Sequence, residues 1–185
     1  MDRFKIIEYE QAGPELKEIY DETMQLMGTP FVINWFKCQG SNIELLKGNW
    51  EKVKTTLLQT NIPMLLKQLI LYKVSKERGC KYCTFLHQAT ADKLGLELCQ
   101  DNNFKITEDL EGDFIPASYK TALRIVSKCA LDPLSTTDED FEDLRNEGFT
   151  DLEIQELMAQ ADLINMLNTI ADISGIDFDK EMLGM

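Results

Sequence analysis

The chain has 185 residues and carries 19 lysines and arginines against 32 aspartates and glutamates, which gives a formal net charge of −13. Such an acidic surface repels polyanions, so it argues against binding to nucleic acids or to anionic membranes. The hydrophobic fraction of 44% and the charged fraction of 28% are typical of an ordered globular protein, and the length favours a single domain with a substantial core.

The N-terminal segment and the cysteines indicate the compartment. Residues 1–17, MDRFKIIEYEQAGPELK, carry charges throughout and lack the apolar run of a secretory signal peptide. No stretch approaches the roughly 18 uninterrupted apolar residues of a membrane-spanning helix. We therefore expect a cytoplasmic, reducing environment, in which the five cysteines need an explanation other than structural disulfides.

Hydrophobic periodicity predicts helices over most of the chain. Residues 14–27 begin with a proline and end before a glycine, as an amphipathic surface helix does. Residues 29–40 are aromatic and apolar and fit either a short buried helix or an irregular segment. Further helices are expected at residues 41–58, 64–78, 80–95, 116–130, 136–147 and 150–173, with a long acidic surface loop at 99–115.

The helix starts and the missing strand signals define the fold class. The patterns Ser41–Glu44 and Thr150–Glu153 have the Ser/Thr-x-x-Glu form of a capping box, which begins a helix. Strand signals are nearly absent, because there is no Asn-Gly or Asp-Gly hairpin turn and no sustained alternation of apolar and polar residues. The sequence therefore predicts an all-α fold, a helical bundle that forms one domain over residues 1–185.

The candidate site lies in the helix predicted at 80–95. Cys80 and Cys83 are three residues apart and Cys83 and His87 are four apart, so the three side chains share one stripe of the helix. A Cys-x-x-Cys pair in a first helical turn is able to close a disulfide, and the helix N-terminus favours the thiolate. His87 is the only histidine in the chain, and it is placed to take the proton of Cys83.

Two other interpretations fit these residues. The three side chains are possible zinc ligands, with a carboxylate or one of the remaining cysteines, Cys38, Cys99 and Cys129, as the fourth. Structural zinc sites usually take ligand pairs from two segments, however, and the chain has no second pair. Alternatively the cysteines are small buried apolar residues, which suits Cys38 and Cys129 but leaves the placement of His87 to chance.

Other conspicuous residues have structural interpretations. Trp35, Phe36 and Trp50 are expected to pack in the core or in a subunit interface. The eight methionines, at helical spacing, are expected to fill gaps in the core. The acidic run DEDFED at 138–143 lacks the Asp-x-Asp-x-Asp-Gly loop with a closing glutamate, so it indicates a solvated helix rather than a calcium site.

The motif and its surroundings resemble a known family. The segment from about Ser41 to Gly95 is similar to the alkylhydroperoxidase D-like (AhpD-like) branch of the carboxymuconolactone decarboxylase family. The resemblance rests on the apolar helix LKQLILYKVS, on a tyrosine between the cysteines, on a later glycine, and on the motif itself, Cys80-x-x-Cys83-x-x-x-His87. It implies an AhpD-like helical bundle with a core at about residues 41–125, which assembles into a symmetric homo-oligomer, a trimer or a hexamer.

The resemblance also implies an activity. The chain would be a thiol-dependent peroxidase that reduces hydrogen peroxide or organic hydroperoxides in antioxidant defence. Cys83 would be the peroxidatic thiolate, His87 its proton relay, and Cys80 the resolving cysteine that closes a Cys80–Cys83 disulfide. A dithiol reductant or a redox-partner protein would reset the pair. No cofactor or metal is expected.

One position departs from the family pattern. The best-studied members have a glutamate twelve residues before the first cysteine, and here that place holds Gln68. Because glutamine forms hydrogen bonds but does not accept a proton as a base, we expect weaker peroxidase activity or a changed reductant. Glu77 is the alternative carboxylate for the relay, although a solvated charge at a helix end is the nearer interpretation.

Three other functions stay open. The cysteine pair serves equally well in a thiol–disulfide oxidoreductase that uses no peroxide. The lactone decarboxylase activity that names the wider family does not depend on a Cys-x-x-Cys pair, so the cysteines argue against it. A non-enzymatic, redox-sensing helical oligomer, whose disulfide changes its affinity for a partner, gains weight from Gln68.

Overall fold

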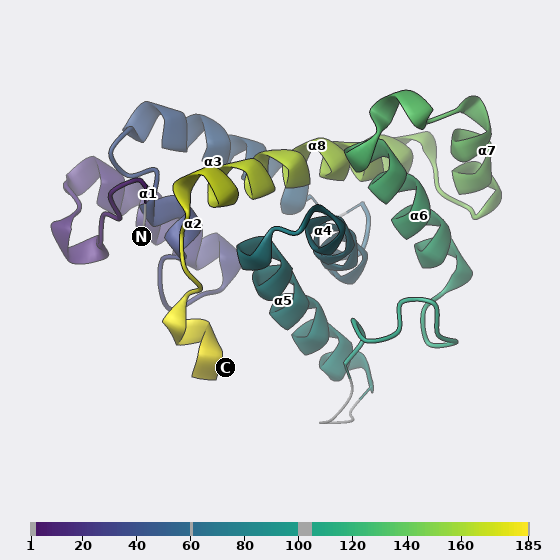
Figure 1. The fold of residues 1–185 in the computed structure, drawn as a ribbon, viewed down its shortest axis with the longest axis horizontal. Coiled ribbons are helices and arrows are strands. Elements are labelled where there is room, and N and C mark those ends of the chain that lie inside the picture. The colour runs from purple at the N-terminus through teal and green to yellow at the C-terminus, as the bar shows by residue number, and fades with distance from the viewer. Residues whose placement is uncertain (1–2, 60, 100–104, 185) are drawn as a thin grey trace. The chain divides into compact units, whose positions relative to one another are not determined.

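The computed structural model describes residues 3–59, 61–99 and 105–184. In these ranges the regular structure is entirely helical, with no β-strand, which confirms the all-α prediction (Figure 1). None of these helices has both the length and the apolar composition that crossing a lipid bilayer requires. The α-helices are α1 (Pro14–Met27), α2 (Asn34–Lys37), α3 (Ile43–Leu57), α4 (Met64–Arg78), α5 (Lys81–Cys99), α6 (Ala117–Leu131), α7 (Asp138–Asn146) and α8 (Asp151–Ser174). The 3-10 helices are η1 (Tyr9–Gln11), η2 (Pro133–Ser135) and η3 (Lys180–Gly184).

Some helix boundaries differ from the prediction. The undecided segment at 29–40 contains one short helix, α2. The helix expected to end at Gly95 continues to Cys99, because a single buried glycine does not interrupt a helix. Of the loop predicted at 99–115, residues 100–104 lie outside the described residues, and residues 105–116 form turns and bends.

Side-chain caps explain where α3 and α8 begin. Thr150 and Glu153 form the predicted capping box, since the Thr150 N–H donates to the Glu153 carboxylate at 2.7 Å and the Glu153 N–H donates to the Thr150 hydroxyl at 3.3 Å. The capping box predicted at Ser41 is wrong. The Asn42 side chain caps α3 one residue later, where it accepts the Leu45 N–H at 3.2 Å.

The chain divides into two compact units. One contains residues 1–54 and 169–185, and the other contains residues 55–168. That residues 1–185 form one domain stays a prediction. All the predicted site residues, Cys80, Cys83, His87, Gln68 and Glu77, belong to the 55–168 unit.

An aromatic cluster lies in the interior of the unit formed by residues 1–54 and 169–185. Trp35, Phe36 and Trp50 are each at most 2% exposed, which confirms that they pack in the core. Phe36 packs edge to face with both tryptophan rings, at centroid separations of 5.2 and 5.4 Å. Near the C-terminus, the Asp179 carboxylate accepts the Asn34 N–H at 2.6 Å and so holds its segment against the start of α2.

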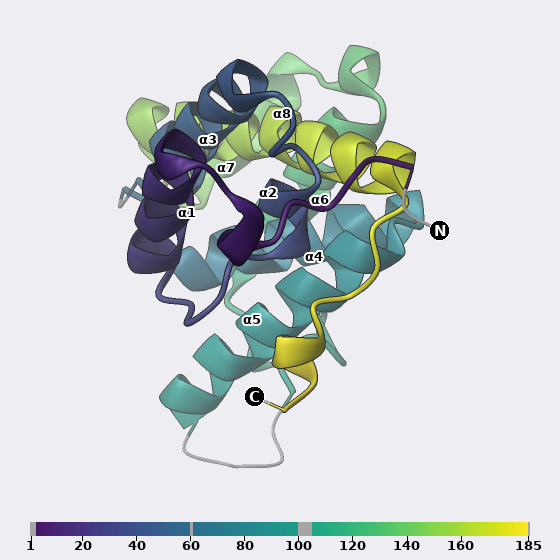
Figure 2. The same cartoon turned by 90° about the vertical axis from the view of Figure 1, so that its left-hand side faces the viewer.

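Helix α4 is central to the 55–168 unit. It packs against α5 and α6, and α6 packs against α7. Residues 66–72 of α4 are all buried, so the helix is covered on every side. The chain then turns at Gly79, whose φ of +77° is the left-handed conformation that glycine adopts after a helix, and enters α5 at once (Figures 1 and 2).

A buried lysine fixes one side of α4. Lys67 is fully buried, and its ammonium group forms an ion pair with the Glu156 carboxylate of α8. The same group donates to the carbonyl oxygens of Leu57, at 3.0 Å, and of Gln59. Since these carbonyls lie at and just beyond the end of α3, the lysine supplies the donors that a helix C-terminus lacks. The residue preceding Gln68 is thus held rigidly in place.

Candidate active site

Cys80 and Cys83 lie at the N-terminal end of α5. Helix α5 begins at Lys81, one residue later than predicted, and Cys80 directly precedes it. The Cys80 N–H bonds back to the Ser75 carbonyl of α4 at 3.0 Å. Its own carbonyl accepts the first helical hydrogen bond, from the Thr84 N–H at 3.0 Å. Cys83 lies in the first turn, where the backbone N–H groups lack helical partners and carry partial positive charge.

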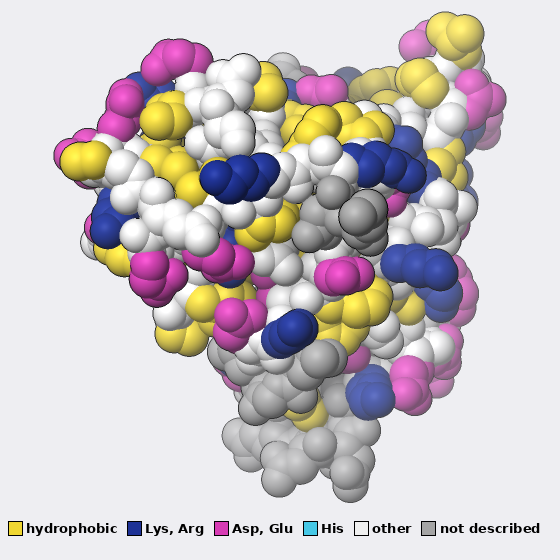
Figure 3. Space-filling model, turned by 60° about the vertical axis from the view of Figure 1, so that its left-hand side comes forward, with side chains coloured by type: hydrophobic (Ala, Val, Ile, Leu, Met, Phe, Trp, Pro, Cys, Tyr) yellow, Lys and Arg dark blue, Asp and Glu magenta, His cyan; other side chains and the backbone are white. Residues whose placement is uncertain are grey.

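Both thiols are buried. Cys80 is 0% exposed and Cys83 is 1% exposed, and no disulfide joins them in the structure. His87 is 4% exposed and lies one turn beyond Cys83 on the same stripe of α5. No histidine is visible on the face drawn in Figure 3, where acidic, basic and apolar side chains are interspersed. The three residues of the motif are therefore buried together along one face of the helix.

Gln68 of α4 contacts His87. The Gln68 side-chain oxygen, Oε1, lies 2.9 Å from His87 Nδ1. An amide oxygen only accepts hydrogen bonds, so Nδ1 carries the ring proton and donates it. The second ring nitrogen, Nε2, then has a lone pair. Nε2 is buried and has no hydrogen-bond partner, which leaves it open to accept a proton.

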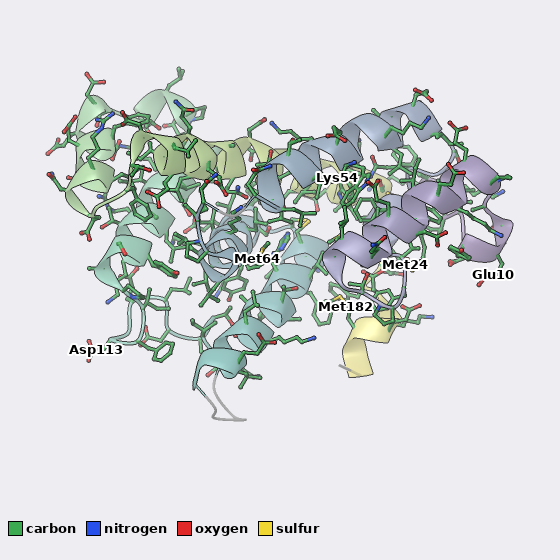
Figure 4. The ribbon with its side chains drawn as sticks, turned by 180° about the vertical axis from the view of Figure 1, so that it is seen from behind. Glu10, Met24, Lys54, Met64, Asp113 and Met182 are labelled. Atoms are coloured by element: carbon green, nitrogen blue, oxygen red, sulfur yellow. The ribbon has the colours of Figure 1, made fainter. Side chains whose placement is uncertain are left out.

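Met64 sets the orientation of the Gln68 amide. The Gln68 amide nitrogen, Nε2, faces the Met64 sulfur at 3.6 Å, and its oxygen therefore faces the histidine. Met64 begins α4, one helical turn before Gln68, and Figure 4 labels it. Because a thioether sulfur is a weak acceptor with no donor, it favours the amide nitrogen at this side. One turn of α4 thus fixes the tautomer of His87.

Burial also determines the charge of His87. Desolvation lowers the pKa of His87 from its ordinary value of 6.5 to about 3. The imidazole is therefore neutral at physiological pH. A neutral Gln68 does nothing to offset this, because it brings no negative charge to the histidine.

Glu77 lies elsewhere on α4. Its side chain is partly exposed near the end of the helix and pairs with the Lys73 ammonium at 2.6 Å. Both residues line an open groove of about 620 Å³ together with the α6 residues Lys120, Arg124 and Lys128. The structure thus brings Gln68, and not Glu77, into hydrogen-bond contact with His87.

The remaining cysteines belong to other parts of the chain. Cys38 is buried beside the carbonyl of Trp35, at 3.2 Å, and Cys129 is half-buried in α6. The side chain of Cys99 lies outside the described residues. In the described ranges, no three His, Cys, Asp or Glu side chains are gathered closely enough to hold a metal ion.

Two polar residues near the motif were not singled out from the sequence. The Cys80 sulfur lies 3.9 Å from the backbone oxygen of Asn168 in α8, and the Ser75 hydroxyl donates to the Asn168 side-chain oxygen at 2.9 Å. The one feature of the sequence that could have pointed to Asn168 is its polar amide in an otherwise apolar stripe of the helix, next to Leu167. Nothing in the sequence pattern relates that amide to a cysteine 88 residues earlier.

Comparisons with known proteins find similar solved structures. No family model and no curated protein matches the chain. A structure described as an alkylhydroperoxidase AhpD core, a peroxidase-related protein from Ralstonia eutropha JMP134, superposes with a TM-score of 0.82 at 21% identity, over 100% of this chain and 95% of that one. A peroxidase-related protein from Silicibacter sp. TM1040 gives 0.79 at 21% identity, over 100% and 98%.

A third similar structure belongs to an enzyme with a different named activity. A cysteine-to-alanine variant of the debrominase Bmp8, in complex with 2,3,4-tribromopyrrole, superposes with a TM-score of 0.72 at 19% identity, over 92% of this chain and 89% of that one. At such identities these likenesses establish the fold. They agree with the resemblance found in the sequence, and the chain therefore has the fold of the AhpD-like, peroxidase-related proteins.

Proposed function

We propose that the protein is a thiol-dependent peroxidase that reduces hydrogen peroxide or organic hydroperoxides, with Cys83 as the nucleophile. One observation carries the proposal. The ring nitrogen Nε2 of His87 is buried without a partner, one helical turn beyond Cys83. A neutral imidazole with an open lone pair beside a thiol is what nucleophilic activation requires. The N-terminus of α5 adds a field that favours the thiolate.

The first step oxidises Cys83. His87 Nε2 accepts the thiol proton, and the Cys83 thiolate attacks one oxygen of the hydroperoxide. The O–O bond breaks and Cys83 becomes a sulfenic acid. The departing alkoxide takes the proton back from His87 and leaves as an alcohol, or as water when hydrogen peroxide is the substrate. The imidazole is neutral again at the end of the step.

The second step closes the disulfide. The Cys80 sulfur attacks the sulfur of Cys83, the S–O bond breaks, and the hydroxyl group leaves as water with the proton that Cys80 gives up. An external dithiol, either a small molecule or a partner protein, then reduces the Cys80–Cys83 disulfide by exchange. With this chemistry we propose a cytoplasmic homo-oligomer, a trimer or a hexamer, that acts in antioxidant defence.

A peroxide titration of the reduced protein tests the proposal. One equivalent of hydrogen peroxide, followed by stopped-flow fluorescence and by mass spectrometry, is expected to give one Cys80–Cys83 disulfide per chain. The Cys83→Ser variant should give none, and Cys80→Ser should stop at a sulfenic acid or a mixed disulfide. If the reduced protein consumes neither hydrogen peroxide nor cumene hydroperoxide with any dithiol donor, the peroxidase proposal is wrong. A disulfide that forms only with oxidised thiols would instead favour an oxidoreductase that uses no peroxide.

Reductive dehalogenation is a second candidate. It is supported by the likeness to the debrominase Bmp8, which covers 92% of this chain. The same dithiol is able to supply the two electrons, since conversion of Cys80 and Cys83 to a disulfide reduces a C–Br bond to C–H and releases bromide and a proton. Incubating the reduced protein with a bromopyrrole and measuring bromide separates the two substrate classes. Bromide release without peroxide consumption would favour the second.

A further inference from the structure

The amide of Asn168 is a buried polar group beside the cysteine pair. Asn168 and Ser75 are both 0% exposed, and they lie on α8 and α4 within the 55–168 unit. Their neighbours on α8, such as Ile164 and Leu167, are apolar and buried. A polar side chain at such a position costs free energy unless its donors and acceptors are satisfied.

Two contacts join Asn168 to the turn that carries Cys80, and a third lies within that turn. The Asn168 backbone oxygen accepts the Cys80 thiol at 3.9 Å. The Asn168 side-chain oxygen accepts the Ser75 hydroxyl at 2.9 Å, and the Ser75 carbonyl accepts the Cys80 N–H at 3.0 Å. These contacts form a closed ring of three buried residues. The Cys80 sulfur is thereby held against one residue of α8.

The Asn168 amide nitrogen has no hydrogen-bond partner. Nδ2 is buried and has no hydrogen-bond partner, although the side-chain oxygen of the same amide is bonded. Because Ser75 holds the oxygen, the two N–H donors point away from Ser75. A buried donor without a partner calls for an explanation, and here it belongs to the residue that contacts the Cys80 sulfur.

We propose that Asn168 is a positioning residue for the disulfide-closing step of Cys80. In the reduced protein its backbone oxygen accepts a hydrogen bond from the Cys80 thiol. When Cys80 gives up that proton to attack Cys83, the sulfur is negatively charged and no longer bonds to a carbonyl oxygen. The Nδ2 group of the same residue then supplies the donor that the thiolate needs. This inference rests on the proposed function for the identity of the attacking sulfur.

The atoms and electrons of the disulfide-closing step balance within the Cys80–Cys83 pair. The Cys80 thiolate forms the S–S bond with the Cys83 sulfenic acid, and the S–O bond of Cys83 breaks. The hydroxide that leaves combines with the proton released by Cys80 to form water. The oxidant is the hydroperoxide consumed in the preceding step. Asn168 itself is unchanged and neither gains nor loses a proton.

Two substitutions test the role. Asn168→Asp keeps the shape and the acceptor for Ser75 but replaces the N–H donors with a carboxylate, and Asn168→Leu removes the amide without adding a charge. Rapid quench with a sulfenic-acid trap and mass spectrometry gives separate rates for Cys83 oxidation and for disulfide closure. We expect closure to slow at least tenfold in both variants, while Cys83 oxidation changes less than threefold. A role in folding alone would not separate the two rates.

Asn165 provides a matched control on the same helix. It lies one turn earlier on α8, where its side chain bonds to Arg78 and to the Ala130 carbonyl. Asn165→Leu is expected to change neither rate by more than twofold. Disulfide closure at the wild-type rate in folded Asn168→Leu protein overturns the inference, as does an equal slowing of closure in Asn165→Leu.

A peroxide-free measurement distinguishes failure of the inference from failure of the proposed function. Methyl methanethiosulfonate converts Cys83 to a methyl disulfide, and attack by Cys80 then releases methanethiol. If peroxide oxidises neither cysteine but Asn168→Leu still slows this release tenfold, the peroxidase proposal fails and the role of Asn168 stands. In the opposite case peroxide oxidises Cys83, and the disulfide closes at the same rate in the wild type and in Asn168→Leu after either peroxide or methyl methanethiosulfonate. The role of Asn168 is then wrong and the peroxidase proposal stands.

Discussion

The buried middle of α4 and its exposed end carry the two residues that the sequence offers for the proton relay. Gln68 is 5% exposed and contacts His87 at 2.9 Å, whereas Glu77, nine residues later, pairs with Lys73 on the surface. Gln68 has the position of a relay residue and lacks the proton chemistry. Glu77 has the carboxylate and lacks the position. Location relative to His87, rather than residue type, decides which of them affects the site.

This difference indicates what Gln68 contributes next to His87 in place of a carboxylate. A carboxylate at Gln68 would stabilise the imidazolium and raise the pKa of His87, whereas the amide only fixes the Nδ1–H tautomer. The neutral pair avoids burying an isolated negative charge in α4. In the proposed relay, Gln68 would therefore orient His87 without stabilising its charged form. Variants of His87, Gln68 and Glu77 test whether orientation or charge matters more at this site.

The largest effect is expected from His87→Asn. Removing the only imidazole takes away the proposed acceptor of the Cys83 proton, and general-base catalysis typically contributes roughly 10²- to 10⁴-fold. We expect the second-order rate of Cys83 oxidation by hydrogen peroxide to fall at least a hundredfold at pH 7.5, measured by stopped flow. The unfolding transition of the variant serves as its control. A folded variant that reacts at the wild-type rate would show that Cys83 needs no base.

A smaller effect of opposite sign is expected from Gln68→Glu. The carboxylate would accept the Nδ1–H of His87 and stabilise the charged ring, so the rate of Cys83 oxidation should rise about tenfold, the effect of one pKa unit. Gln68→Leu, which removes the acceptor altogether, should lower the rate. Both rates come from the same stopped-flow assay. Equal rates in all three proteins would mean that the contact with His87 has no part in the reaction.

The sequence predicted what depends on neighbours along one helix. The stripe of Cys80, Cys83 and His87 follows from a spacing of three and four residues, and the all-α fold follows from helical periodicity and the absence of strand signals. Gln68 was identified only through the family resemblance, since its contact with His87 joins residues 19 apart. Asn168 contacts Cys80 across 88 residues, and no local pattern encodes such a contact. The packing of α4 against α5 and α8 supplies that part of the site.

Stability below neutral pH provides a further test of the burial of His87, the α5 residue that Gln68 contacts. Burial lowers the pKa of His87 to about 3, so between pH 6.5 and 3 the unfolded chain binds a proton at this residue and the folded chain does not. The free energy of unfolding therefore falls as the pH drops through this window, by up to about 1.4 kcal/mol per pH unit, and is independent of this group above it. Urea unfolding at pH 7.5, 6.5, 5.5 and 4.5 should show a shallower decline in His87→Asn than in the wild type. Parallel declines would mean that His87 is protonated in the folded protein.

The smallest effect is expected at the exposed end of α4, from Glu77→Gln. The Lys73–Glu77 pair is a surface ion pair at a spacing of four residues, and such pairs contribute about 0.3–0.5 kcal/mol. We expect the rate of Cys83 oxidation to stay within twofold of the wild type and the free energy of unfolding to fall by no more than this amount, less at high salt. A loss of activity comparable with that of His87→Asn would place Glu77 in the relay after all. Because Glu77→Gln and Gln68→Glu exchange the same two residue types in opposite directions on one helix, their combined result separates the effect of charge from the effect of position.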